Sequence, residues 1–234
     1  MASTRPETAP SVVDRITHEL RNRIKRGHLV GGQRLIEVDW TREFGVSRGP
    51  VREALGRLAS EGLVVVEPKR GAVVRRLTPK DIYDLYEARA ALEGQAAALA
   101  ARCIRDADHT TRLRELLREN AKFLRGGEFV RYLPVNERFH HLVLELADNQ
   151  VIERLAGQLH AMAYHLQATR VARATAPSPV LSVAGSAKFH REIGGAILVS
   201  DEVAADQLMR RHIYETRDGI LAVDQDTPRA IGLS

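Results

Sequence analysis

One short stretch, residues 36–63, constrains the fold more than any other: IEVDWTREFGVSRGPVREALGRLASEGL. Gly45 separates two segments with helical spacing, and a glycine there can adopt the positive φ that a sharp corner between helices requires. Ser47 is expected to cap the second helix through its hydroxyl, and Pro50 is tolerated near the start because its missing N–H has no intrahelical partner there. The stretch therefore predicts two short helices joined by a tight turn.

The second of these helices carries an apolar face and a basic face. Apolar residues recur at three- and four-residue steps and predict a buried stripe of Val51, Ala54, Leu55, Leu58, Ala59 and Leu63. Arg48, Arg52 and Arg57 fall largely off that stripe. Such a helix after a tight turn is typical of a recognition helix in the DNA major groove. An ordinary surface helix with solvated arginines would have the same composition.

Two β-rich segments follow, LVVVEP and AVVRRL, with Lys69, Arg70 and Gly71 between them. This pattern predicts a two-stranded hairpin with a basic tip. A basic tip can simply favour solubility. Next to a recognition helix, it is better interpreted as a wing that touches the minor groove or the phosphates.

The positive charge of the chain is concentrated in its first third. The whole chain has a net charge of +5, and residues 1–76 hold 15 Lys and Arg against 9 Asp and Glu, a net of +6. The remainder holds 20 against 21, a net of −1. A basic head is what binding to a phosphate backbone requires, because neutralised phosphates release counterions and the field steers association.

The composition changes after Thr78-Pro79-Lys80-Asp81, which predicts a capped helix start with proline at the first position. Beyond it the chain is rich in alanine, leucine and arginine with helical spacing. We expect helices at about 79–104, 108–125, 128–147, 149–175, 179–199 and 201–223, with a loose tail over 224–234.

The residue order in GVSRGPVREALGRLASEGLV, followed by EPKRGAVV, closely resembles the winged helix-turn-helix head of the GntR family of bacterial transcription regulators. Gly49 stands where that family usually has threonine, so one hydroxyl contact is expected to be missing. Carried over position by position, the resemblance implies DNA contacts at Ser47, Arg48 and Arg52 and wing contacts at Lys69, Arg70 and Gly71.

The remainder, from about Leu77 to Val223, resembles the FCD ligand-binding domain of the FadR subfamily. The resemblance rests on DLYEARAALEGQAAALAA, on Asn136-x-x-Phe139-His140, and on AKFHREIGGAILVSDEVAADQLMRRHI. Together the two resemblances imply a mainly α protein. Residues 11–76 would form a winged helix-turn-helix with a small β-hairpin wing, and residues 77–223 an all-α bundle of six or seven helices for effector binding and dimerisation.

Four residues of this second part are candidate metal ligands. Asn136 and His140 are four residues apart and share a helix face, and His190 and His212 fall on two later helices. A single histidine on such a face is usually a satisfied core or surface residue. Three of them, with an oxygen-bearing partner, in a body that resembles a metal-containing domain, indicate one divalent metal.

Three imidazoles and one oxygen suit Zn²⁺, Ni²⁺, Co²⁺ or Mn²⁺. Many members of the resembled subfamily have aspartate where Asn136 stands, and a neutral amide is expected to weaken the site or shift its metal preference. The other histidines nearby, His141, His160 and His165, do not match the ligand positions and are expected to be structural or exposed.

Arg89 lies among small apolar neighbours in YEARAALEG and resembles an inward arginine that such domains direct at the carboxylate of an effector. Its guanidinium offers a planar, two-pronged donor. An ion pair with Glu93, one helical turn later, is an equally good interpretation from the sequence.

Composition excludes several classes of protein. No run approaches the ~20 apolar residues of a membrane span, and residues 1–10 lack the apolar core of a secretory signal. The single cysteine, Cys103, excludes an internal disulfide framework, fits a reducing cytoplasm, and is expected to be buried as a small apolar residue.

The sequence thus predicts a cytoplasmic, homodimeric regulator that is not an enzyme. It would repress a metabolic operon by binding a short inverted repeat in double-stranded DNA, and respond to a small carboxylate effector. Two alternatives stay open. One is a metal-dependent hydrolase with a DNA-targeting head, for which Glu137 adjoins the site in sequence but about 100° around the helix from Asn136. The other is a constitutive DNA-binding dimer whose body only dimerises.

Overall fold

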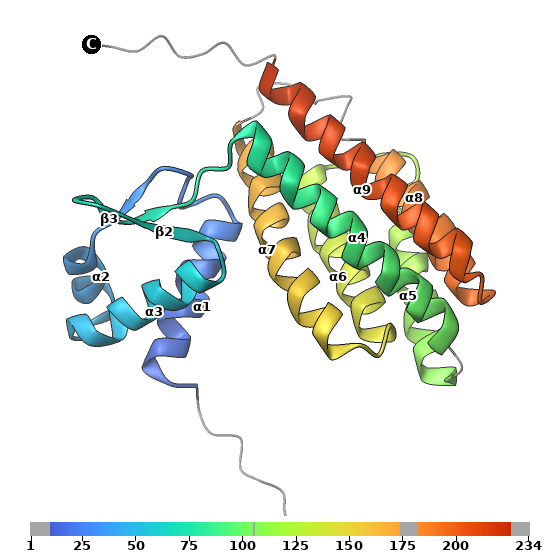
Figure 1. Ribbon diagram of the computed structural model, residues 1–234, viewed down its shortest axis with the longest axis horizontal. Helices are drawn as coiled ribbons and strands as arrows, with labels where there is room; N and C mark the ends of the chain where they lie inside the picture. The colour runs from blue at the N-terminus through green and yellow to red at the C-terminus, as the bar shows by residue number, and fades with distance from the viewer. Residues whose placement is uncertain (1–9, 105, 174–181, 226–234) are drawn as a thin grey trace, which may run out of the picture. The chain divides into compact units, whose positions relative to one another are not determined.

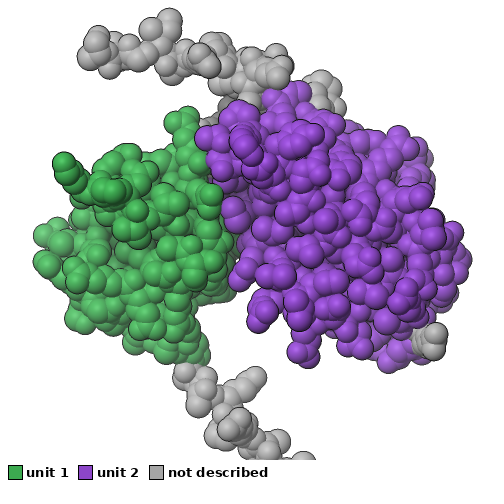
Figure 2. Space-filling view, viewed as in Figure 1, with its two compact units in different colours: residues 1–76 green, residues 77–234 purple. Residues whose placement is uncertain are grey.

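The chain divides into two compact units, residues 1–76 and 77–234, coloured separately in Figure 2. The computed structural model describes residues 10–104, 106–173 and 182–225. Each unit has a buried hydrophobic core of its own, as expected for a separate domain.

The first unit contains the expected pair of helices and the turn between them. In chain order its elements are α1 (Val12–Lys25), β1 (Arg34–Leu35), α2 (Glu37–Phe44), α3 (Arg48–Ser60), β2 (Val64–Glu67) and β3 (Gly71–Val74) (Figure 1). The corner after α2 is Gly45, whose φ of 65° lies in the left-handed region, as expected from the sequence. The expected apolar stripe is buried except for Ala59, which is half-buried, and α3 packs against α1. Arg48, Arg52 and Arg57 are exposed.

Two details at the start of α3 and in the wing differ from expectation. Ser47 is the N-cap residue of α3, but its hydroxyl makes no capping hydrogen bond. The wing sheet has three strands rather than two, in the order β1-β3-β2, with both pairings antiparallel and Val73 opposite both Arg34 and Val65. The additional strand β1 is only two residues long, which is too short to show an alternating pattern in the sequence.

The second unit is helical throughout its described residues, which confirms the fold class expected from the sequence. Its helices are α4 (Pro79–Cys103), α5 (Ala107–Ala121), α6 (Phe129–Leu146), α7 (Gln150–Arg173), α8 (Val183–Leu198) and α9 (Glu202–Gln225). Thr78 caps α4 through a reciprocal pair of hydrogen bonds with Asp81, as its sequence predicts. The expected start of α8 near 179 and most of the expected tail lie outside the described residues.

The central helix of this unit is α4, which packs against α6, α7, α8 and α9 (Figure 1). The alanines and Gly94 of α4 allow α9 to pack closely against it. A Cβ added to Gly94 would lie 2.7 Å from a carboxylate oxygen of Asp206 on α9. Cys103, expected to be buried, is only half-buried because it ends α4. Among the described helices, none is both long and apolar enough to cross a membrane.

Candidate metal centre and nucleic-acid interface

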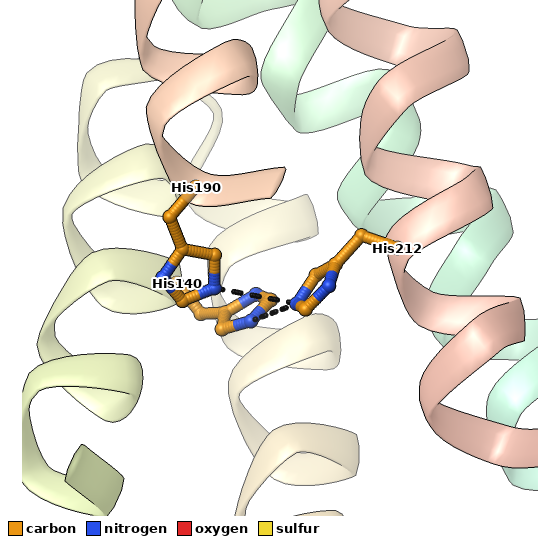
Figure 3. Close-up of side chains that lie close together, drawn as sticks. All are labelled: His140, His190 and His212. Atoms are coloured by element: carbon orange, nitrogen blue, oxygen red, sulfur yellow. Dashed lines mark hydrogen bonds between the residues drawn. The ribbon is translucent and has the colours of Figure 1, made fainter. Parts of the chain in front are cut away.

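Three histidines from three helices of the second unit meet in its interior. His140 lies on α6, His190 on α8 and His212 on α9, and their rings point toward one another (Figure 3). The Nε2 atom of His212 lies 3.3 Å from the Nε2 atom of His140 and 3.3 Å from that of His190. A donor atom of each ring can therefore face one common point.

All three imidazoles are buried, and burial favours their neutral form. Burial lowers the pKa of His140, and it lowers the pKa of His190 and His212 well below the usual value, with further lowering by the neighbouring histidines. A neutral imidazole has one ring nitrogen with a free lone pair, and that is the form that binds a metal. Three such nitrogens at one point suit a divalent transition metal such as Zn²⁺.

A carboxylate behind His140 fixes which of its nitrogens has the lone pair. Glu93 Oε2 lies 2.6 Å from His140 Nδ1. Burial alone would raise the pKa of Glu93, but the positive charge of Arg89 and the contact with His140 hold it well below the usual value. The ionised carboxylate can only accept, so Nδ1 carries the proton and the lone pair of His140 is on Nε2, which faces His212.

The phenol of Tyr132 occupies the corresponding place behind His190. Its hydroxyl lies 3.1 Å from His190 Nδ1 and 2.9 Å from the hydroxyl of Ser186. Burial raises the pKa of Tyr132, so the hydroxyl remains protonated and neutral. With His190 bound to a metal through Nε2, Nδ1 would donate to this hydroxyl.

Arg89 is in direct contact with Glu93 rather than free in a pocket. Its Nε donates to Glu93 Oε1 at 2.7 Å, and its Nη2 donates to His160 Nδ1 at 3.1 Å. The two side chains of the ion pair are only 2% and 1% exposed. The intrahelical pair considered from the sequence is therefore present, and an effector-binding role for Arg89 must be compatible with it.

A second group of potential ligands, Glu93, His140 and His160, lies beside the first. The guanidinium of Arg89 already contacts two members of this group, so a metal cation there would face a buried positive charge. His160 accepts from Arg89 through Nδ1, which places its proton on Nε2, a buried nitrogen without a hydrogen-bond partner among the described residues. These contacts favour the three-histidine group as the metal position.

A cavity of about 90 Å³ opens beside the three-histidine group. Its walls include Arg89, Tyr132, Asn136, His140, Phe189 and His212. Asn136 thus shares a cavity with two of the histidines, one turn before His140 on α6. The amide of Asn136, two imidazoles and the arginine all border the same space.

The predicted ligands are therefore neighbours in the structure, and three buried residues were missed. Glu93 was considered only as a partner of Arg89, whereas it also holds His140, 47 residues later. Tyr132 was not considered, and His160 was placed among the residues without a specific role. Four-residue spacing on α4 did suggest the pair with Arg89, which is present. The sequence pattern does not indicate that α4 packs against α6 and α7, which carry Tyr132 and His160.

In the first unit, the residues expected to contact DNA lie together on the exposed side of α3. Ser47 and Arg48 are exposed at its N-terminus, and Arg52 follows one turn later. Arg52 Nε donates to Glu37 Oε2 at 2.8 Å in an exposed ion pair, and among the described residues Nη1 and Nη2 make no hydrogen bond within the chain. Paired donors of this kind match the O6 and N7 acceptors of guanine.

The wing presents its basic residues at the turn between β2 and β3. Lys69 and Gly71 have positive φ values of 63° and 75°, which makes the turn sharp, and Lys69, Arg70 and Gly71 are exposed. Arg70 forms an exposed pair with Glu67 at 2.8 Å. A screened pair of this kind exchanges readily for a phosphate.

The carboxylate that adjoins the site in sequence does not face it. Glu137 lines a shallow groove with residues of α5 and α6, whereas Asn136 and His140 line the cavity. Glu137 also lies 4.0 Å from His141, which is exposed. As the general base of a hydrolase, Glu137 is therefore on the wrong side of α6.

The first unit is a winged helix-turn-helix with exposed arginines, and it is joined in one chain to a helical unit with buried potential ligands. These features define a class, the transcription regulators with a second helical domain. Residues 12–74 match the family described as bacterial regulatory proteins, gntR family, and residues 84–215 match the FCD domain. The chain belongs to the GntR family of transcriptional regulators and carries an FCD domain.

Similar proteins carry names of the same kind. The chain is 33% identical over 213 residues to an uncharacterized HTH-type transcriptional regulator in an unstable DNA locus of Streptomyces ambofaciens, covering 90% of this chain and 85% of that protein. It is 30% identical over 210 residues to the probable D-xylose utilization operon transcriptional repressor of Paenarthrobacter nicotinovorans, covering 90% and 87%. The solved structure of E. coli McbR/YncC has a TM-score of 0.74 at 21% identity, covers 92% of this chain and 98% of that one, and shares the fold.

Proposed function

We propose that this regulator is a homodimeric, metal-containing repressor that releases its operator when a small carboxylate binds in the second unit. The observation that carries the proposal is the meeting of three histidine Nε2 atoms beside a cavity that Arg89 and Asn136 also line. A relative named as a repressor of a sugar-utilisation operon supports repression as the outcome.

His140, His190 and His212 would hold the metal, with Asn136 as an oxygen ligand from the cavity side. A bound Zn²⁺, Ni²⁺, Co²⁺ or Mn²⁺ would supply a Lewis-acidic position for an effector oxygen. The protein side chains do the rest: buried neutral imidazoles donate lone pairs, and Glu93 and Tyr132 orient two of the rings.

The effector would be a small acid. Arg89 brings a buried positive charge to the cavity wall, and carboxylates pair well with guanidinium groups. The cavity of about 90 Å³ is smaller than the roughly 150 Å³ space that accommodates benzene, which favours an acid of a few carbon atoms. Its binding would alter DNA affinity only to the extent that it prefers one arrangement of the dimer over another.

The first unit would read the operator. Arg48 and Arg52 would contact base edges in the major groove, and Ser47, whose hydroxyl makes no capping bond, would contact a phosphate. Lys69, Arg70 and Gly71 would place the wing on the backbone or in the minor groove. Two heads related by a dimer axis would match a short inverted repeat. A cytoplasmic location, where the operator lies and thiols stay reduced, fits the single cysteine.

The test is selection of binding sites from random duplex DNA by the Zn²⁺-loaded full chain, with its mass in solution measured by sedimentation. We expect a dimer that enriches one inverted repeat, and release of that repeat by at least one member of a panel of two- to six-carbon acids. A monomer that enriches no sequence would contradict the DNA-reading part. Enrichment without release by any acid would contradict the effector part and favour a constitutive DNA-binding protein.

A further inference from the structure

Among the described residues, Glu93 is the only carboxylate that forms a hydrogen bond with a proposed metal ligand. Its two partners, His140 and Arg89, are both buried. One oxygen lies 2.6 Å from His140 Nδ1, and the other accepts from Arg89 Nε at 2.7 Å. Glu93 and His140 are on α4 and α6, two helices that pack against each other. Both side chains are almost inaccessible, at 1% and 2% exposure.

We propose that Glu93 is the positioning residue of the metal site, which holds the Nδ1–H of His140 and thereby directs the Nε2 lone pair toward His190 and His212. This inference rests on the proposed metal site. Glu93 itself lies outside the proposed ligand set. An imidazole without this acceptor could rotate or carry its proton on Nε2, and in that form His140 would not bind a metal.

Arg89 completes the arrangement by holding the other oxygen of Glu93. The four-residue spacing on α4 brings the guanidinium alongside the carboxylate, and His160 Nδ1 accepts from Nη2 of the same guanidinium. The carboxylate is therefore fixed from both ends, at Arg89 and at His140. A fixed carboxylate in turn fixes the orientation of the ring that it holds.

The partner of His190 provides an internal comparison. The Tyr132 hydroxyl is shared between His190 at 3.1 Å and Ser186 at 2.9 Å, whereas one carboxylate oxygen of Glu93 lies 2.6 Å from His140 and the other is ion-paired with Arg89. Hydrogen bonds to a charged acceptor are shorter and roughly twice as strong as neutral ones. Replacement of the Glu93 carboxylate by a neutral amide should therefore weaken metal binding more than removal of the Tyr132 hydroxyl.

The experiment measures the Zn²⁺ affinity of the chelator-stripped full chain by competition with a chromophoric chelator, and the visible absorption spectrum of the Co²⁺ form. We expect Glu93→Gln to weaken Zn²⁺ binding about 10- to 100-fold and to alter the Co²⁺ spectrum, and Tyr132→Phe to have a smaller effect. The matched control is Glu87→Gln, also on α4, which breaks the pair between Glu87 and Arg217 without contact with a proposed ligand. It should keep the wild-type affinity and spectrum.

Because Glu93→Gln leaves Arg89 buried without its counter-charge, a second variant separates positioning from folding. Arg89→Met combined with Glu93→Gln removes both charges, and we expect it to fold and still to show the loss of Zn²⁺ affinity. Wild-type Zn²⁺ affinity and an unchanged Co²⁺ spectrum in this double variant would overturn the positioning role of Glu93. The same result would leave the proposed metal site itself intact. Absence of Zn²⁺ binding by the wild-type chain would instead overturn the metal site, and this inference with it.

Discussion

Each unit of the chain contains an arginine that is ion-paired with a glutamate at nearly the same distance, and the surroundings give the two pairs different roles. Arg52 and Glu37 in the first unit are 65% and 34% exposed at 2.8 Å, while Arg89 and Glu93 in the second are 2% and 1% exposed at 2.7 Å. An exposed pair is worth little and exchanges easily, whereas breaking a buried pair leaves an uncompensated charge. We therefore propose that the surface pair gives way to DNA and that the buried pair holds the metal site in place.

The largest expected effect is on stability, when each arginine is removed in turn. Arg89→Ala leaves the ionised Glu93 buried, and we expect it to destabilise the second unit by about 3–5 kcal/mol. Arg52→Ala should cost less than about 1 kcal/mol. The measurement is urea unfolding followed by helical circular dichroism, with the fluorescence of Trp40, the single tryptophan, reporting the first unit. Equal losses for the two variants would contradict the comparison.

For specific operator binding we expect the opposite order, with the larger effect at Arg52. We expect Arg52→Ala to weaken specific operator binding by about 1–3 kcal/mol and to relax the preference at one base pair, because a bidentate base contact is lost. Metal stabilisation should be unchanged in the same variant. Fluorescence anisotropy with selected and scrambled duplexes measures the effect. Full specific affinity after Arg52→Ala would refute the assignment of α3 as the recognition helix.

Asn136 tests the chemistry of the cavity with a smaller change. Asn136→Asp adds a negative charge to the proposed ligand set, and we expect about tenfold tighter Zn²⁺ binding, or roughly 1.4 kcal/mol. The same change should lower the stability of the metal-free protein, since it buries a carboxylate among neutral imidazoles. Chelator competition and thermal unfolding measure the two effects. An unchanged affinity would show that residue 136 is not a ligand.

The smallest expected effect belongs to the wing. Lys69→Ala should weaken binding to selected and scrambled DNA alike, and reduce the slope of log K against log salt concentration by about 1, because one phosphate contact is lost. The salt dependence of affinity, compared with that of wild type, gives the slope. A loss confined to the selected sequence would instead place Lys69 on a base edge.

The two units also differ in how far the sequence predicted them. In the first unit the helix pair, the left-handed Gly45 and the hairpin are local features, and local spacing was sufficient to predict them. The strand β1 was missed because its pairing with β3 joins residues about 40 positions apart in the chain. Ser47 is the N-cap residue as predicted, but its side chain makes no capping hydrogen bond. The residue type therefore predicted the start of the helix and not the hydrogen bond.

In the second unit the histidines were predicted as ligands, and the structure brings their rings together. The residues behind the rings were not predictable in the same way. Glu93 and Tyr132 reach His140 and His190 through the packing of α4 on α6 and of α6 on α8, and helical periodicity carries no information on which faces meet.

A metal centre at the three histidines is tested most simply by thermal unfolding of the chelator-stripped full chain with and without each of Zn²⁺, Ni²⁺, Co²⁺ and Mn²⁺, repeated for His140→Ala. A metal at about 100 times its dissociation constant adds roughly 2.7 kcal/mol, which should raise the midpoint of the wild type by several degrees. We expect at least one metal to do so for the wild type and none for His140→Ala. An equal rise in both proteins, or none in either, would contradict a metal centre at the three histidines.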